Sequence, residues 1–402
     1  MSEVVKMEER KGSPDWSEFI NPVLKSLPPS GIRRFFDLVS EMKDVVSLGV
    51  GEPDFVTPRN IIDACVRSLD NGQTGYTSNQ GMLELREAIA EEINGSYGVK
   101  YDPVSEILIT VGVSEALDLA MRALISPGDE VLIPEPTYVS YIPCAALAYA
   151  KTVPLKTNMD KLFRVTAEQV EKAITPRTKI LLLAYPNNPT GAVMTRQELL
   201  DICEVVKAHN LIVISDEIYE HLTYIEPHTC VSSLPGMKER TILLSGFSKS
   251  YAMTGWRAGY ACGNPDFIGA MTKIHQYSML CAPTQAQVCA LEALRSGKPD
   301  MRRMTAEYNK RRKLVVDAME EIGLPCFEPG GAFYAFPDIT KTRMNAAEFS
   351  ERLLMEEKVA VVDGTAFGEA GEGHVRISYA YSVEKLTEAF RRMNRFVKRY
   401  SS

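Results

Sequence analysis

Short apolar runs alternate with amphipathic stretches through the middle of the chain. The runs EILITVG, DEVLIPEP, TKILLLAYP, LIVISDE and RTILLSGF are bounded by turn-forming residues, and such near-continuous apolar segments are typical of parallel strands covered on both faces. Between two of them, TRQELLDICEVVKAHN begins with a capping box of Thr195 and Glu198 and carries Leu199, Cys203 and Val206 on one face. This alternation predicts an α/β fold with a mostly parallel sheet and helices on both faces.

The pattern changes at residues 296–300, where SGKPD precedes a charged helical stretch. A final helix is expected after Ser382, because apolar residues recur there at helical spacing, at Leu386, Phe390, Met393 and Val397. We therefore expect two domains, a large one over residues 49–297 and a smaller α+β domain made of residues 1–48 and 298–402. A chain of 402 residues is long enough for two such cores.

The composition is that of an ordinary globular protein, with 45% hydrophobic and 24% charged residues. The formal net charge of −7 gives no electrostatic reason to expect nucleic acid or an anionic membrane as a partner. The first residues lack the apolar core of a signal peptide, and no apolar run approaches the roughly 18 residues of a membrane-spanning helix. The eight scattered cysteines and five histidines show no metal-ligand spacing, so we expect no metal site and a cytoplasmic location.

Polar residues gather where the predicted strands end, which is where doubly wound sheets bind their ligands. Asn188 follows one strand in a rigid turn, Asp216 follows another, and Lys249 follows a third. Each has a structural alternative, respectively a turn former, a helix N-cap and a solvated lysine. Taken together with neighbouring groups, they are the parts needed to hold pyridoxal phosphate. The neighbouring groups are Tyr219, Ser248, Arg257 and a helix start at Val113 and Ser114.

Three motifs in this order, NPTG, DEIY and SK followed by GWR, resemble those of the class I aminotransferases, within the fold-type I pyridoxal-phosphate enzymes. The resemblance covers nearly the whole chain, from SLGVGEPDFVTP through TGYTSNQGMLELREAI, YPNNPTGAV, SDEIYEHL and SGFSKSYAMTGWRAGY to GHVRISYA. Each fragment alone is a weak signal, but their order is specific. The resemblance implies an enzyme that moves an amino group from an amino acid to a 2-oxo acid through pyridoxal phosphate.

The resemblance assigns five side chains to the ring of the cofactor. Lys249 would bind the cofactor aldehyde covalently and later carry a proton between substrate and cofactor, for which its pKa must be lowered. Asp216 would keep the pyridine nitrogen protonated, and Asn188 and Tyr219 would donate hydrogen bonds to the phenolic oxygen. Tyr138, in EPTYVSY, would stack on the ring, with a plain core tyrosine as the alternative.

The cofactor phosphate would be bound by the side chains of Arg257 and Ser248 and by the backbone N–H groups of Val113 and Ser114. The chain departs from the family pattern at one point. Many relatives carry a serine three residues before the lysine, where this chain has Gly246. A phosphate contact from that position therefore stays open.

The substrate α-carboxylate would lie at Arg376, in GHVRISYA, beside Asn188 and the backbone of Gly51. An internal salt bridge is the alternative for Arg376, because an arginine in an apolar setting requires an anion. Tyr76, in TGYTSNQG, would reach the cofactor phosphate of the other subunit, which implies a homodimer with shared active sites. We expect 2-oxoglutarate as acceptor and ping-pong kinetics, while aspartate, aromatic, alanine and acylated diamino-acid donors all stay open.

Rival functions fit the motifs less well. Ser245 and Lys249 are one residue too far apart for an S-x-x-K hydrolase. Gly49-Val50-Gly51 continues as Glu-Pro-Asp, which is not the dinucleotide-binding pattern. A non-enzymatic regulator with this fold would carry an added DNA-binding helix-turn-helix, for which the N-terminal segment is too short. A β-lyase or another fold-type I enzyme stays as the alternative, because the fold does not determine the reaction.

Overall fold

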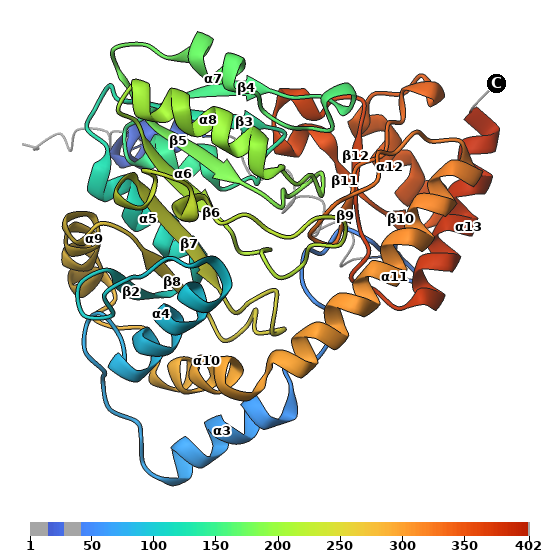
Figure 1. The fold of residues 1–402 in the computed structure, drawn as a ribbon. Coiled ribbons are helices and arrows are strands. Elements are labelled where there is room, and N and C mark those ends of the chain that lie inside the picture. Colours follow the sequence, from blue (N-terminus) through green and yellow to red (C-terminus); the bar gives the residue numbers. More distant parts are fainter. Residues whose placement is uncertain (1–14, 28–41, 401–402) are drawn as a thin grey trace, which may run out of the picture.

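The computed structural model describes residues 15–27 and 42–400. Its centre is a seven-stranded sheet in the order β2-β8-β7-β6-β5-β3-β4 (Figure 1). Strand β8 alone runs in the direction opposite to the other strands of this sheet, so the predicted α/β fold with a mostly parallel sheet is confirmed. The strands are β2 (Ile107–Val111), β3 (Glu130–Glu135), β4 (Lys151–Lys156), β5 (Thr178–Ala184), β6 (Ile212–Asp216), β7 (Thr241–Gly246) and β8 (Ala258–Cys262).

Helices cover both faces of this sheet. Alternate residues of its central strands are therefore buried in apolar clusters on opposite sides. In β5, Ile180 and Leu182 belong to one apolar cluster, whereas Leu181 and Leu183 belong to another. The first cluster is covered by α5 (Gly112–Leu124), α6 (Tyr141–Leu147) and α9 (Pro265–Ser278). The opposite face is covered by α4 (Leu83–Tyr97), α7 (Ala167–Ala173), α8 (Arg196–Ala208) and α10 (Thr284–Ser296). The capping box of Thr195 and Glu198 is present at the start of α8.

Two strands of the sheet differ from the predicted pattern. The edge strand β4 has the sequence KTVPLK, of which only Leu155 is buried. An edge strand tolerates polar residues and a proline because one of its sides forms no ladder. Strand β8, AGYAC, is buried but rich in small residues, so it lacks a strong apolar signal.

A second structured region is formed mainly by the C-terminal part of the chain, at the right of Figure 1. Strand β1 (Val46–Ser47) pairs in parallel with β10 (Val359–Ala360), so residues before the large sheet join it. A separate sheet has the order β11-β12-β9, from β11 (Val362–Asp363), β12 (Val375–Ser378) and β9 (Tyr334–Ala335). Its helices are α11 (Lys298–Ile322), α12 (Ala346–Glu357) and α13 (Val383–Tyr400).

The expected apolar stripe of α13 is buried, from Leu386 to Val397. Helix α11 begins at Lys298, within the SGKPD sequence. The division into domains at residues 48 and 297 stays a proposal. The remaining α-helices of the described residues are α1 (Pro22–Ser26) and α3 (Arg59–Asp70), of which α3 packs against α10. Over residues 15–27 and 42–400, none of the helices combines the length and the apolar character that crossing a membrane requires.

Candidate active site

A cavity of about 430 Å³ lies where the carboxyl ends of the large sheet meet the smaller sheets. Ala184 ends β5, Asp216 ends β6, and Lys249 follows the end of β7. The smaller sheets contribute Arg376 from β12 and Tyr334 from β9. Every predicted site residue except Tyr76 lines this cavity. They are Gly51, Val113, Ser114, Tyr138, Asn188, Asp216, Tyr219, Ser248, Lys249, Arg257 and Arg376.

Lys249 presents its amine to this cavity. Its Nζ donates a hydrogen bond to the backbone oxygen of Gly51 at 2.7 Å. Burial, together with the positive charge of Arg376, lowers the pKa of Lys249 from 10.5 to about 8. A larger fraction of this amine is therefore neutral at pH 7 than for a solvated lysine, which is the state that a nucleophile needs.

Asp216 is a buried carboxylate at the end of β6. The hydroxyl of Tyr141 donates to its Oδ2 at 2.8 Å, and the N–H of Ile218 donates to its Oδ1 at 3.2 Å. Burial raises the pKa of Asp216 to about 6, although both hydrogen bonds favour the ionised form. Sequence reasoning missed Tyr141, although it lies in the same EPTYVSY segment as Tyr138.

Tyr219 lies against a second residue that the sequence analysis missed. The hydroxyl groups of Tyr219 and Tyr334 are hydrogen-bonded at 2.9 Å. A Cβ added to Gly51 would meet the Tyr334 hydroxyl at 2.5 Å, so this position has no room for a side chain. Tyr138 packs edge-to-face on Tyr141, with ring centroids 5.5 Å apart.

Arg376 is buried and lacks a carboxylate partner among the residues that the structure describes. Its Nη1 donates to Asn188 Oδ1 at 2.9 Å and its Nη2 to the backbone oxygen of Gly49 at 2.6 Å. Its Nε is buried and has no hydrogen-bond partner among the described residues. The guanidinium stacks on Tyr334 and Phe367, 4.6 and 4.9 Å from the ring centroids. A buried cation held only by neutral groups is arranged to receive an anion.

A second guanidinium lies at the N-terminus of α5. A Cβ added to Gly112, which has a φ of +73°, would meet Arg257 Nη2 at 2.6 Å, so arginine and helix start touch. Arg257 itself has a φ of +58° and donates from Nη1 to the backbone oxygen of Thr254 at 3.0 Å. Val113 and Ser114 follow in the first turn, where backbone N–H groups have no partner within the helix. This arrangement suits a phosphate.

Gly246, the departure noted in the sequence, has a structural reason. A Cβ at this position would meet the backbone oxygen of Ala258 and the Cα of Gly259, both at 2.9 Å. These atoms belong to the neighbouring strand β8, and a backbone cannot yield as a flexible side chain can. A serine at this position would therefore collide with β8.

Tyr76 is the predicted site residue that the structure does not bring to the cavity. It lies on the irregular segment before α4, and 84% of its surface is exposed. Its predicted contact lies on another subunit, so that contact stays a prediction. Sequence reasoning also missed Glu52, which lines the cavity and accepts a hydrogen bond from Thr254 at 3.3 Å. Its position directly after Gly51 was the available signal.

Known proteins resemble this chain along almost its whole length. The protein YugH of Bacillus subtilis is 49% identical over 381 residues, which are 95% of this chain and 99% of YugH. An aspartate aminotransferase of Pyrococcus abyssi is 46% identical over 92% of this chain and 96% of its own. The crystal structure of an aromatic aminotransferase from Pyrococcus horikoshii has a TM-score of 0.88 at 46% identity, covering 92% of this chain and 99% of that chain.

A family match agrees with these relatives. Residues 43–393 match the family described as aminotransferase class I and II, whose enzymes depend on pyridoxal phosphate. That range contains every residue of the cavity described above. The chain belongs to the class I and II aminotransferases.

Proposed function

We propose that this aminotransferase moves the amino group of an amino acid to 2-oxoglutarate, in ping-pong fashion, through pyridoxal phosphate bound to Lys249. The observation that carries the proposal is one cavity that combines the Lys249 amine with two guanidinium groups, those of Arg257 and Arg376. Neither guanidinium has a carboxylate partner among the described residues. One cation suits the phosphate of the cofactor, and the other suits the carboxylate of an amino acid.

The remaining side chains of the cavity fit the cofactor ring. Asp216 would face the pyridine nitrogen, since a buried carboxylate is the partner that a protonated ring nitrogen requires. Asn188 and Tyr219 would donate to the phenolic oxygen, and Tyr138 would stack on the ring. Val113, Ser114 and Ser248 would complete the phosphate contacts, and Gly51 would approach the substrate carboxylate through its backbone.

When bound, pyridoxal phosphate supplies an aldehyde that takes up an amino group and a ring that accepts the electron pair left by the α-proton. Lys249 would hold that proton and move it between the α-carbon of the substrate and the cofactor carbon, because its lowered pKa allows both protonation states near neutral pH. Asp216 would hold the proton on the ring nitrogen. Arg376 would orient the substrate by gripping its carboxylate with two parallel N–H groups.

Cofactor uptake tests the first part of the proposal. Purified protein incubated with pyridoxal phosphate should turn yellow, and borohydride reduction should place the cofactor mass on the peptide that contains Lys249. The Lys249→Ala variant is the matched control, which should bind the cofactor reversibly but retain no label after reduction. Protein that takes up no cofactor, or that carries the label on another lysine, would refute the assignment.

Steady-state kinetics test the reaction. Initial rates over a grid of amino donor and 2-oxoglutarate concentrations should give parallel double-reciprocal lines, because the first product leaves before the acceptor binds. The donors to screen include aspartate, which is named for the Pyrococcus abyssi relative, and aromatic amino acids, as in the name of the Pyrococcus horikoshii structure. Release of ammonia or sulfide without amino transfer would identify a lyase instead.

The working unit that we propose is a homodimer with active sites shared through Tyr76. Its support is the exposure of this tyrosine on the single chain, outside the cavity that its role requires. The cytoplasmic location likewise stays a prediction, which cell fractionation would test.

A further inference from the structure

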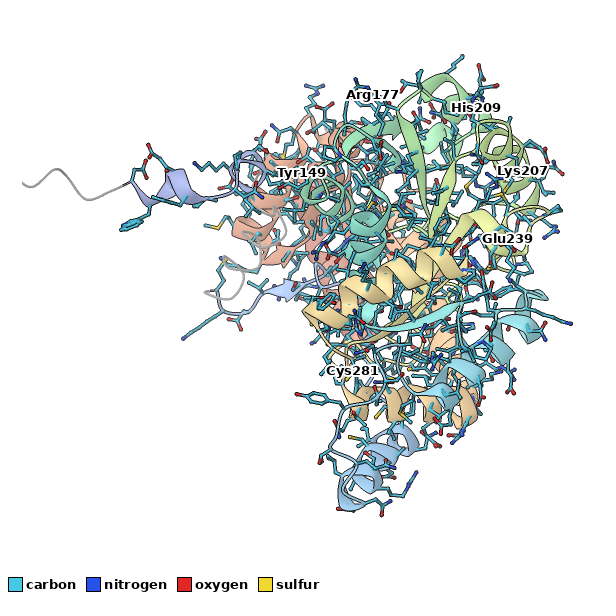
Figure 2. All side chains as sticks on the ribbon, turned by 90° about the vertical axis from the view of Figure 1, so that its left-hand side faces the viewer. Tyr149, Arg177, Lys207, His209, Glu239 and Cys281 are labelled. Carbon is cyan, nitrogen blue, oxygen red and sulfur yellow. The ribbon has the colours of Figure 1, made fainter. Side chains whose placement is uncertain are left out.

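A buried hydrogen-bonded pair of side chains lies directly behind the N-terminus of α5, outside the cavity. His275, on α9, is fully buried, and its Nδ1 lies 2.7 Å from Oε1 of Glu115, in the first turn of α5. The two residues are 160 positions apart in the chain. Figure 2 faces α9, which lies over the strands of the large sheet on this side of the molecule. Because a carboxylate only accepts hydrogen bonds, the Nδ1 of His275 must be the donor.

The other oxygen of Glu115 holds the turn that begins α5. Its Oε2 accepts a hydrogen bond from the backbone N–H of Val111 at 2.6 Å. Val111 ends β2 and is followed by Gly112, against which Arg257 packs. Glu115 therefore connects His275 to the strand-to-helix turn that carries the proposed phosphate contacts.

The charge of Glu115 opposes the phosphate that this turn would receive. A carboxylate in a first helical turn stabilises the helix, but it also repels a second anion at the same terminus. The N–H of His275 offsets part of this negative charge. His275 also leaves its Nε2 buried without a partner in the described part of the chain, which by itself destabilises the fold. Stability alone is therefore a poor explanation for a histidine at this position.

We propose that His275 is a positioning residue for the cofactor phosphate: by donating to Glu115, it offsets the carboxylate charge and so sets the affinity of the α5 N-terminus for phosphate. This inference rests on the proposed function, because it requires that the phosphate of the cofactor binds at Val113, Ser114 and Arg257. It concerns binding of the phosphate group only. It therefore predicts a difference between pyridoxal phosphate and pyridoxal, which lacks the phosphate.

The experiment titrates full-length protein stripped of cofactor with pyridoxal phosphate and, separately, with pyridoxal, followed by absorbance. His275→Gln should weaken binding of pyridoxal phosphate about tenfold and leave pyridoxal binding within about twofold. Glu115→Gln removes the charge but keeps an oxygen for the Val111 N–H, so it should tighten binding of pyridoxal phosphate and leave pyridoxal binding unchanged. The double variant His275→Gln/Glu115→Gln should recover the affinity that the single His275 change loses.

A matched control is His209→Gln, because His209, the residue that follows α8, is exposed (Figure 2). Its Nε2 lies 4.0 Å from Glu171. This control should bind both ligands as the unaltered protein does. If His275→Gln lost affinity for both ligands equally, or lost affinity for neither, the inference would be overturned. If His275→Gln does not fold, Glu115→Gln decides alone. Tighter binding of pyridoxal phosphate with unchanged pyridoxal binding would support the inference, and unchanged or weaker binding of pyridoxal phosphate would overturn it. Unaltered protein that binds no pyridoxal phosphate would instead refute the proposed function.

Discussion

At the scale of single residues, burial brings the pKa values of the two central ionisable groups toward neutrality. The pKa of Lys249 is lowered to about 8 and the pKa of Asp216 is raised to about 6, chiefly because burial removes water from both groups. Between these values Asp216 is mostly ionised, and Lys249 exchanges its proton more readily than an ordinary lysine. Both properties are what proton transfer at the substrate requires. They can be tested separately, one through stability and one through a pH profile.

The first prediction concerns the stability of the cofactor-free protein. The pKa of Lys249 is lower in the folded protein than in the unfolded chain, so protonating this amine destabilises the fold. The loss of stability grows as the pH falls from about 10.5 toward 8. Lys249→Met should therefore be more stable than the unaltered protein at pH 7, by up to about 3 kcal/mol, and this difference should disappear near pH 10.5. Urea denaturation at both pH values measures it. Lys161→Met, at an exposed position, is the control and should show no such pH dependence. A difference for Lys249→Met that is independent of pH would contradict the assignment.

The second prediction concerns the hydroxyl of Tyr141. Its hydrogen bond lowers the pKa of Asp216 against the effect of burial. Tyr141→Phe should therefore raise the pKa of Asp216 above about 6 and move the acidic limb of the kcat/KM profile to higher pH. Tyr185→Phe is a suitable control, because that buried hydroxyl bonds to the backbone of Phe163 and Val165 instead. An acidic limb that stays in place would show that Tyr141 does not act on Asp216.

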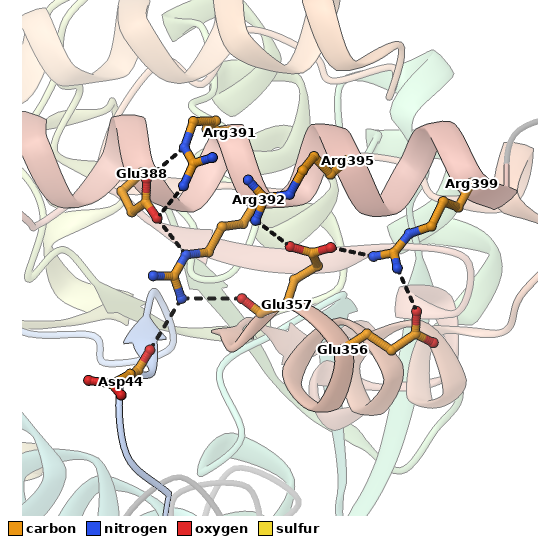
Figure 3. A network of polar contacts seen from close by, with 8 residues as sticks. All are labelled: Asp44, Glu356, Glu357, Glu388, Arg391, Arg392, Arg395 and Arg399. Carbon is orange, nitrogen blue, oxygen red and sulfur yellow. Dashed lines mark hydrogen bonds and ion pairs between the residues drawn. The ribbon is translucent and has the colours of Figure 1, made fainter.

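At the scale of elements, a network of charges connects α13 to the end of α12 and to the segment before β1 (Figure 3). Glu357, the last residue of α12, accepts hydrogen bonds from Arg395 and Arg399 on α13. Arg392 donates to the backbone oxygens of Asp44 and Glu357, at 3.2 and 3.3 Å. The segment at Asp44 leads through β1 to the glycines that line the cavity. The network therefore stabilises the part of the fold that supports one wall of the site.

The third prediction is that this network contributes measurable stability. The Glu357 side chain is 9% exposed and faces two arginines, so its bonds are less weakened by water than those of a surface pair. Glu357→Gln should lower the free energy of unfolding by about 1 to 2 kcal/mol. Glu168→Gln removes an exposed pair with Lys172 and should change the free energy of unfolding much less, because water screens that pair. Urea denaturation of both variants compares them, and equal effects would contradict the assignment.

At the scale of the whole molecule, two strongly exposed aromatic residues lie on segments that contact each other. Tyr76 and Tyr277 are 84% and 82% exposed. Their segments are joined, because Asn79 Nδ2 donates to the backbone oxygen of Leu280 at 2.7 Å. Leu280 is itself 41% exposed. Contiguous exposed apolar side chains are typical of interaction sites, which supports the proposed two-fold interface here.

The fourth prediction tests whether active sites are shared. Tyr76→Phe chains and Lys249→Ala chains, carrying different affinity tags, would be co-expressed and the mixed dimer purified. If each site takes Lys249 from one chain and Tyr76 from the other, the mixed dimer has one unaltered site and one doubly altered site. Its activity should therefore approach half that of the unaltered dimer. Activity no better than the mean of the two parent variants, or a fully active monomer, would contradict shared sites.

Much of the fold and most of the cavity followed from the sequence, and the exceptions have physical reasons. Strands β2, β3, β5, β6 and β7 were predicted because each is a nearly continuous apolar run, a property that each segment carries by itself. The edge strand β4 and the strand β8 were missed because they are extended through pairing with neighbouring strands, and their own composition gives no strong strand signal. Tyr141 and Tyr334 were missed because they contact other side chains of the cavity, and sequence spacing does not reveal such contacts.

By itself, the sequence determined the alternation of strands and helices, the cap of α8 and the residues that follow each strand. These depend on neighbours a few positions away, whose geometry is the same in any fold. Only the tertiary structure decided which groups meet and how strongly water is excluded from them. Arg376 meets Asn188 across 188 positions, and His275 meets Glu115 across 160. The pKa of Lys249 depends on the same assembly, because desolvation is a property of everything packed around a group and not of the residues beside it in the chain.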